Sequence, residues 1–222
     1  MKKAIIISLT LFCLQVISKA QNTVALLTED KKFITAMEAN LKMLDTASAA
    51  STYIMLANGF ERIANIEKKY WQPFYYAALC YGFMASNVPD KNMIDPLAIK
   101  AEGYLEKAKL LNNNSEISAL QAMIINIKIL VDPISRWQTY SMQSAALLQA
   151  AKEQDPLNPR PWLIDARTKL FTPAAMGGGP EAAKLLIEKA LIKYNEFKPE
   201  NSIAPNWGRI PTQKLMDKIN GR

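Results

Sequence analysis

One set of residue intervals recurs along this chain of 222 residues, and it constrains the fold more than any other feature. Four residues spaced by three, one and three positions occur twice, and each set precedes a small residue that lies four positions before a large aliphatic one. The residues are Phe74, Ala77, Ala78 and Tyr81 with Ala101 and Leu105, and then Trp162, Asp165, Ala166 and Lys169 with Ala183 and Ile187. Small residues let two helices approach closely, and large neighbours fill the space beside them. The intervals therefore predict pairs of packed helices that repeat along the chain.

Apolar residues recur at helical spacing through most of the sequence, with proline, asparagine and aspartate between the periodic stretches. This spacing predicts helices over residues 24–45, 48–66, 73–86, 95–111, 116–131, 133–153, 161–171 and 180–194, and a short helix over 212–219. No stretch alternates convincingly with the period of two that a strand needs. The predicted fold class is therefore all-α.

Taken together, these residues resemble the tetratricopeptide repeat, whose pattern W-x2-L-G-x2-Y is followed by A-x3-F and a closing proline. The turn Asp155-Pro156-Leu157-Asn158-Pro159 resembles the turn between repeats of that family. The resemblance implies a TPR-like α-solenoid of antiparallel helix pairs with a right-handed superhelix, as in short secreted Bacteroidota repeat proteins of unassigned role. It covers residues 48–196, with residues 24–45 as a capping helix. Ala78 and Ala166 replace the family's glycine, which indicates divergent repeats.

The first residues have the pattern of a secretory signal. A short basic start is followed by an apolar run from Ala4 to Ile17 and by small residues around Ala20. We expect cleavage between Ala20 and Gln21 and a periplasmic or secreted protein, with an uncleaved membrane anchor as the alternative. No later segment has the length and apolarity of a transmembrane helix. The expected organisation is a signal peptide over 1–20, a helical-repeat domain over 21–196 and a proline-interrupted tail over 197–222 that packs on the last repeat.

Composition argues against several kinds of chemistry. The chain has no histidine, the commonest general base and metal ligand, and Cys80 is the one cysteine left after the expected cleavage. We therefore expect no metal site, no cofactor and no catalytic residues, and we interpret Cys80 as a buried, unreactive thiol. The formal charge of +7 includes three lysines of the signal, so the remainder carries +4. Its basic residues alternate with acidic ones, so no nucleic-acid partner is expected.

Helix pairs of this kind line a groove, and its residues are candidates for binding a partner. On the first helices of two pairs, the stripe that would face the groove includes Gln72, Tyr75, Arg160 and Arg167. Tyr75 supplies contact area and a hydroxyl, and the two arginines could form forked hydrogen bonds with a carboxylate. The alternative is that Tyr75 belongs to the core and the arginines are solvated.

Two intervals are longer than the eight residues that the repeat pattern leaves between its two helices. They are residues 82–100 and 170–182, and they predict long loops on one edge of the stack. The second contains Gly177, Gly178 and Gly179 directly before a predicted helix. One hypothesis is an anion cradle, because a helix start offers unpaired amides. The other is a tight crossover that lets Phe171 and the next helix pack closely.

The leading functional hypothesis is an exported, non-enzymatic adaptor or scaffold in the cell envelope that holds a protein or peptide partner. The alternative is a periplasmic carrier or transport accessory for a small ligand, with a pocket formed by Trp71, Tyr75, Tyr76, Trp137 and Trp162. A third hypothesis is an enzyme that uses carboxylates such as Asp165 and Glu181. Trp207 stands alone in a polar tail, and we interpret it as a plug that docks the tail on the last helix pair. The sequence leaves the oligomeric state open.

Overall fold

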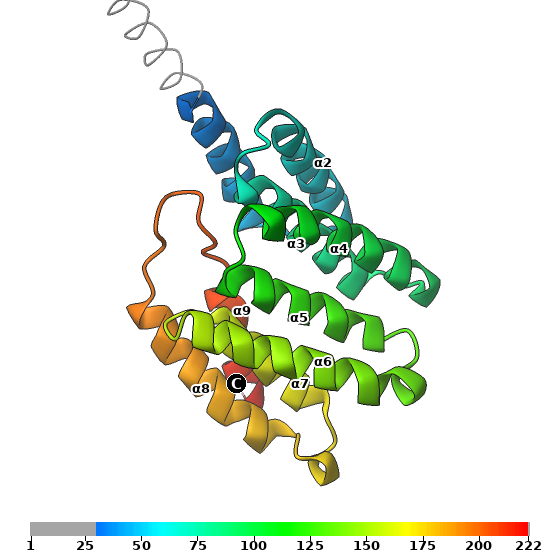
Figure 1. The fold of residues 1–222 in the computed structure, drawn as a ribbon. Coiled ribbons are helices and arrows are strands. Elements are labelled where there is room, and N and C mark those ends of the chain that lie inside the picture. The colour runs from blue at the N-terminus through cyan, green and yellow to red at the C-terminus, as the bar shows by residue number, and fades with distance from the viewer. Residues whose placement is uncertain (1–29, 222) are drawn as a thin grey trace, which may run out of the picture.

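The computed structural model describes residues 30–221, and within them all regular secondary structure is helical (Figure 1). The chain is helical over residues 30–44. The α-helices that follow are α2 (Ala50–Ile66), α3 (Trp71–Asn87), α4 (Ile94–Leu111), α5 (Ser115–Ile129), α6 (Pro133–Gln154), α7 (Arg160–Phe171), α8 (Pro180–Glu196) and α9 (Arg209–Ile219). Two short 3-10 helices are η1 (Lys91–Met93) and η2 (Ala174–Met176). The all-α prediction is confirmed, and the predicted signal over residues 1–20 lies outside the described residues.

Successive helices pack as antiparallel pairs, and the pairs stack into a solenoid (Figure 1). The pairs are α3 with α4, α5 with α6 and α7 with α8, and α3 also packs extensively on α2. The first helices of these pairs, α3, α5 and α7, also contact one another in succession, and we call them the inner row. The helical-repeat solenoid predicted from the residue intervals is therefore confirmed.

Short polar residues begin several helices, as the sequence indicates. The side chain of Asn114 accepts a hydrogen bond from the amide of Ile117 at the start of α5. The side chain of Asp132 accepts one from the amide of Ser135 at the start of α6, where Pro133 occupies the first turn. Such caps satisfy amides that have no partner within the helix, and proline loses nothing in the first turn. These residues fix where each helix of the stack begins.

The prediction of a long loop over residues 82–100 is wrong. Residues 82–87 extend α3 and residues 94–100 begin α4, so only 88–93 connect the two helices, with η1 inside them. The residues beyond the repeat pattern lengthen both helices of the pair instead. In the second interval, residues 172–179 connect α7 to α8 and contain η2.

The inner row forms the centre of the core. Every residue from Gln72 to Gly82 is buried, and so is most of α5 from Ser115 to Ile129. A helix that is apolar around its whole circumference needs cover on every side. Neighbouring helices supply part of that cover, and the connection between α8 and α9 supplies the rest, with Ile203 and Trp207 packed into the main core.

The predicted tail divides into two parts. Residues 209–219 form α9, which contacts α8 and adds Met216 to a small core with Ala183 and Ile187. Residues 197–208 form the connection, which we call the strap, and they reach across the inner row to α3. The strap therefore contacts helix pairs well beyond the last one.

Candidate functional site

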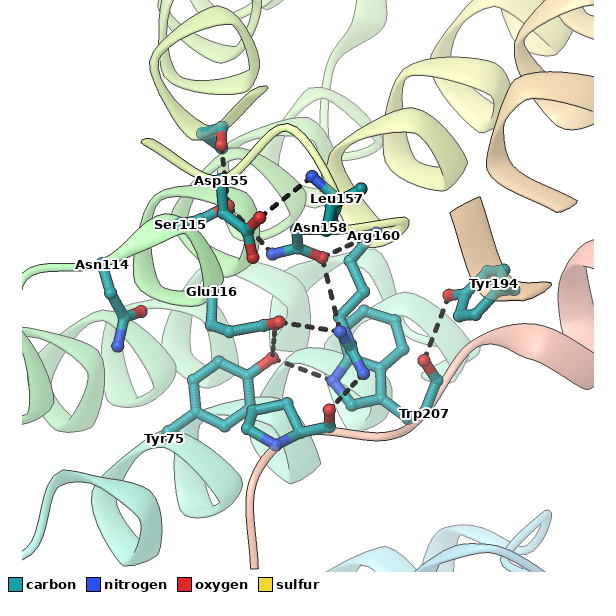
Figure 2. A network of polar contacts seen from close by, with 12 residues as sticks. Tyr75, Asn114, Ser115, Glu116, Asp155, Leu157, Asn158, Arg160, Tyr194 and Trp207 are labelled. Carbon is teal, nitrogen blue, oxygen red and sulfur yellow. Dashed lines mark hydrogen bonds and ion pairs between the residues drawn. The ribbon is translucent and has the colours of Figure 1, made fainter. Parts of the chain in front are cut away.

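Arg160, the first residue of α7, is fully buried at the centre of a polar network (Figure 2). Its guanidinium donates a hydrogen bond from Nη1 to Oε1 of Glu116 at 2.7 Å, which is also an ion pair. Nη2 donates to the backbone carbonyl of Pro205 in the strap. A buried charge is tolerated when it is both paired and hydrogen-bonded, and Arg160 meets both conditions.

Tyr75 connects the ion pair to the strap (Figure 2). Its hydroxyl donates to Oε2 of Glu116 at 3.3 Å and accepts a hydrogen bond from Nε1 of Trp207 at 2.9 Å. Burial raises the pKa of Tyr75 well above its ordinary value, so the phenol is neutral and keeps its proton. The network thereby joins α3, α5, α7 and the strap.

Burial and the neighbouring charge shift the pKa of Glu116 in opposite directions. Desolvation raises the pKa of its carboxyl group, whereas the positive charge of Arg160 and the hydrogen bond from Tyr75 lower it. Asn158 supports the arginine from the same side, because its Oδ1 accepts from the Arg160 amide and its Nδ2 donates to Oγ of Ser115. This arrangement holds the carboxylate and the guanidinium in one fixed geometry.

The four candidate groove residues occupy different environments. Tyr75 and Arg160 come together, through Glu116, inside the network. Gln72 is buried on α3, and its Oε1 has no hydrogen-bond partner. Arg167 lies further along α7 and is exposed. Sequence reasoning missed Glu116, although a glutamate at the start of the apolar helix α5 is the kind of signal that indicates a buried pair. It recognised Trp207 as a docking residue but did not predict its contact with Tyr75 of α3.

The aromatic residues of the hypothetical ligand pocket do not converge on an open cavity. Tyr75 and Tyr76 are core residues, and Trp71 packs edge-on against Tyr75 with ring centroids 5.5 Å apart. Trp137 lies on α6 and Trp162 on α7, where Trp162 is flanked by the ammonium groups of two lysines. The large aromatic side chains of α3 therefore build the interior of the solenoid.

The glycine segment before α8 is a tight crossover in this structure. The amides of Gly177, Gly178 and Gly179 donate to the carbonyls of Ala174, Pro173 and Lys169, which leaves none of the three for a bound anion. Gly177 and Gly179 have φ values of 77° and 97°, which favour glycine. Phe171 is 77% exposed and does not pack under the crossover. The geometry favours a structural role for this segment.

Replacing Gly178 with alanine is expected to lower the free energy of unfolding by about 1–3 kcal/mol, the usual cost of overpacking. A Cβ at this position would lie 2.2 Å from the carbonyl oxygen of Thr172 and 2.7 Å from that of Lys169, so backbone has to move. Gly103 is the matched control, because it lies in α4 with no atom near its absent Cβ. Gly103→Ala should stabilise the protein by about 0.5–1 kcal/mol. Urea denaturation measures both, and equal midpoints for the two variants would contradict the expectation.

Two surface pockets lie at opposite ends of the described chain. The larger, of about 680 Å³, lies between the N-terminal helix (residues 30–44) and α2. Its lining consists of the apolar residues Phe33, Ala36, Ile63 and Ile66, the lysines 32, 68 and 69, and Glu67. The smaller, of about 510 Å³, lies between α8 and α9 and is lined by Leu191, Asn195, Arg209, Ile210, Gln213 and Lys214. Both combine apolar and cationic side chains.

The larger pocket has an aromatic stack behind it and an exposed aliphatic residue at its rim. Phe33 stacks on Tyr70 with ring centroids 4.2 Å apart and an interplanar angle of 6°. The hydroxyl of Tyr70 donates to Asp30 at 2.7 Å, and Lys69 forms an ion pair with the same carboxylate at 3.1 Å. Ile66 is 78% exposed at the end of α2. We take this pocket as the candidate ligand site, because a large exposed aliphatic residue beside three lysines suits an apolar anion.

Among residues 30–221, no cluster of histidine, cysteine, aspartate and glutamate side chains has the arrangement of a metal site. In the same residues no helix combines the length and apolarity needed to cross a membrane. Cys80 is buried, as predicted, and burial raises the pKa of its thiol.

A comparison with known structures shows which family this chain belongs to. The HusA haemophore from Porphyromonas gingivalis superposes with a TM-score of 0.76 and 33% sequence identity, over 85% of this chain and 93% of that one. The chain belongs to the HusA family. No protein-family model matches the sequence, and no curated protein matches it. Similarity to HusA thus accounts for the helical repeat-like fold, while the more specific tetratricopeptide assignment stays a prediction.

Proposed function

We propose that this protein is an exported, non-enzymatic carrier of haem or of a chemically similar ligand. The main support for the proposal is membership of the HusA family, because HusA is a haemophore and this chain matches 93% of its length. This is the small-ligand alternative of the sequence analysis rather than its leading hypothesis. Export is proposed from the signal-like segment that ends at Ala20.

The pocket between residues 30–44 and α2 suits the two kinds of surface that haem presents. The macrocycle is flat and apolar, and Ile63 and Ile66 offer an apolar contact surface, whereas Phe33 behind them is nearly buried. The two propionate groups are carboxylates, and Lys32 and Lys68 place cations at the edge of the same pocket. With about 680 Å³, the pocket also has a volume typical of small-molecule sites, which run from about 300 to 1,000 Å³.

The pocket provides contacts for the porphyrin ring and its propionates but no usual axial ligand for the iron. The sequence contains no histidine, and the residues that line the pocket include no methionine, cysteine or tyrosine, which are the other usual axial ligands of haem. Tyr70 lies behind Phe33, and its hydroxyl is bound to Asp30. We therefore infer that apolar contact and ion pairing provide most of the affinity at this site.

Charge reversal at the pocket tests the proposal. We expect the purified protein to bind haem, and we expect Lys32→Glu/Lys68→Glu/Lys69→Glu to lower the affinity by about 10- to 100-fold. Each cation near a carboxylate contributes about 0.5–1 kcal/mol to binding. Absorbance titration with haem measures the affinity, and iron-free protoporphyrin, titrated in parallel, should bind with similar strength and lose affinity in the same variant.

A matched variant separates the pocket from the overall charge. Lys91→Glu/Lys198→Glu/Lys218→Glu makes the same change in net charge at exposed residues outside the pocket. It should leave the affinity within about twofold of the wild type, since none of the three residues lines the pocket and salt screens exposed charges. Equal losses in both triple variants would place the ligand elsewhere, and a wild-type protein that fails to bind either tetrapyrrole would refute the proposed function.

The adaptor hypothesis has less support at the surface where it was expected. A partner peptide was predicted to lie in the groove of the first helices, but the strap occupies the inner row. The described residues therefore offer surface pockets, of which the one at α2 is the larger of the two described, in place of an open peptide groove.

A further inference from the structure

Three lysines line the pocket at α2, and one of them already has a partner. The ammonium group of Lys69 forms an ion pair with Oδ1 of Asp30 at 3.1 Å and lies 4.9 Å from the ring centroid of Tyr70. In the part of the chain that the structure describes, neither Lys32 nor Lys68 forms an ion pair. The three lysines therefore differ in whether a carboxylate of the protein already holds them.

The position of Asp30 is fixed by the aromatic stack behind the pocket. The Oδ1 atom that pairs with Lys69 also accepts a hydrogen bond from the hydroxyl of Tyr70 at 2.7 Å. Tyr70 in turn stacks on Phe33, which lines the pocket. Hydrogen bonds to an ionised group are the stronger ones, and these two lower the pKa of Asp30, so its carboxyl group is ionised at neutral pH. Asp30 thus stays beside Lys69 as a negative charge.

The remaining cations match the charged groups of the proposed ligand in number. Lys32 belongs to the N-terminal helix and Lys68 to the connection between α2 and α3, so the two ammonium groups come from different elements around the pocket. Glu67 also lines the pocket and offsets part of their charge. A carboxylate of the ligand that approached Lys69 would meet the carboxylate of Asp30 as well, and like charges disfavour that position.

We propose that Asp30 is a positioning residue of this pocket: it holds Lys69 away from the ligand and leaves Lys32 and Lys68 to bind the two carboxylates of a dicarboxylate tetrapyrrole. This inference rests on the proposed function and deepens it, because it says which charged groups of the same pocket act on the ligand. Asp30 acts through Lys69 and by repulsion. It therefore keeps the affinity below the value that three unpaired lysines would give.

Removing the negative charge of Asp30 should tighten binding. The side chain of Asp30 is 44% exposed, and Asp30→Asn keeps its shape and an oxygen that can accept from Tyr70, so we expect the variant to fold. It should bind iron-free protoporphyrin about 3- to 10-fold more tightly than the wild type in an absorbance titration, because one cation is freed and one anion is lost. Glu38→Gln is the matched control, since Glu38 is an exposed acid of the same helix outside the pocket. It should change the affinity by less than about twofold.

A double variant separates the charge of the ion pair from the two lysines assigned to the ligand. Lys69→Met leaves Asp30 without its cation and should weaken binding about 2- to 5-fold. Asp30→Asn combined with Lys69→Met removes a neutral pair, so its affinity should return to within about twofold of the wild type. Lys32→Met and Lys68→Met should each weaken binding about 2- to 5-fold, in the wild type and in the double variant alike.

The dimethyl ester of protoporphyrin provides a measurement that a purely structural role of Asp30 would not change. The ester keeps the macrocycle and lacks both carboxylate charges, so the wild type should bind it about 4- to 25-fold more weakly than the diacid. Asp30→Asn should tighten binding of the diacid alone. A structural change of the pocket would instead alter the affinities for both ligands together.

The outcomes distinguish this inference from the function on which it rests. If the wild type binds protoporphyrin but Asp30→Asn binds it no more tightly, or gains equally for the ester, the positioning role of Asp30 is overturned and the carrier function stands. A double variant that loses as much affinity as Lys32→Met would also overturn it, since Lys69 would then bind the ligand. A wild-type protein that binds no tetrapyrrole would refute both.

Discussion

Replacing Arg160 with methionine is expected to lower the free energy of unfolding by about 3–5 kcal/mol, the usual cost of removing one partner of a buried ion pair. The variant leaves Glu116 in the interior without its cation, and Pro205 without the donor to its carbonyl. Arg160 is fully buried and Glu116 nearly so, so water cannot replace the lost partner. Chemical denaturation at neutral pH measures the loss.

Two further variants distinguish the buried charge from the general effect of losing an arginine. Arg167→Met changes an exposed arginine of the same helix and should shift stability by no more than about 0.5 kcal/mol. Combining Arg160→Met with Glu116→Gln removes both charges, and the pair should be less destabilised than Arg160→Met alone. A loss below about 1 kcal/mol in the single variant would mean that Glu116 finds another partner or takes up a proton.

The proton-binding behaviour of Glu116 adds a pH dependence to the same variants. Burial raises the pKa of Glu116 in the folded protein, so the folded state holds its proton more strongly than the unfolded state does. The contribution of Glu116 to the free energy of unfolding therefore falls as the pH rises above the pKa that its carboxyl group has in the unfolded state. Asp95 acts in the opposite direction, because its hydrogen bonds with Arg136 lower its pKa, and its contribution is lost as pH falls.

The sequence was sufficient to place most of the helices because their signals are local. Asn114, Asp132 and Pro133 lie beside the helix starts that they determine, and the small residues Ala101 and Ala183 are buried where the pairs meet. The wrong prediction of a long loop over residues 82–100 also comes from reading a local pattern. The repeat pattern fixes which residues pack, but it does not limit how far each helix continues beyond them.

The filled inner row could not be predicted, since its contacts join residues that are far apart in the chain. Trp207 and Tyr75 are 132 positions apart, and Arg160 and Glu116 are 44 apart. A tryptophan in a polar tail indicates a docking residue but not the surface on which it docks. The pocket at α2 offered a weak signal in Ile66 followed by Lys68 and Lys69, which is equally typical of an ordinary helix end.

Gly208→Ala is expected to destabilise the protein by about 2–5 kcal/mol, the sum of a left-handed backbone and a steric clash. Gly208 has a φ of 108°, and a Cβ there would lie 2.0 Å from the hydroxyl of Tyr194 and 3.0 Å from Cδ2 of Leu163. The clash would push Tyr194 from its hydrogen bond with the Trp207 carbonyl, at the point where the strap meets α9. Thermal and urea unfolding measure the loss.

Gly221→Ala is the matched control for this effect. Gly221 also has a positive φ, of 73°, but no atom lies within 4 Å of its absent Cβ. Only the backbone cost of about 1–2 kcal/mol applies there, and a chain end reduces it further. The difference between the two variants therefore isolates the contact with Tyr194 and Leu163. If both variants lose equally little, the strap is not tightly seated at Gly208, and its hold on the inner row depends on the contacts of Tyr76, Arg160 and Trp207 instead.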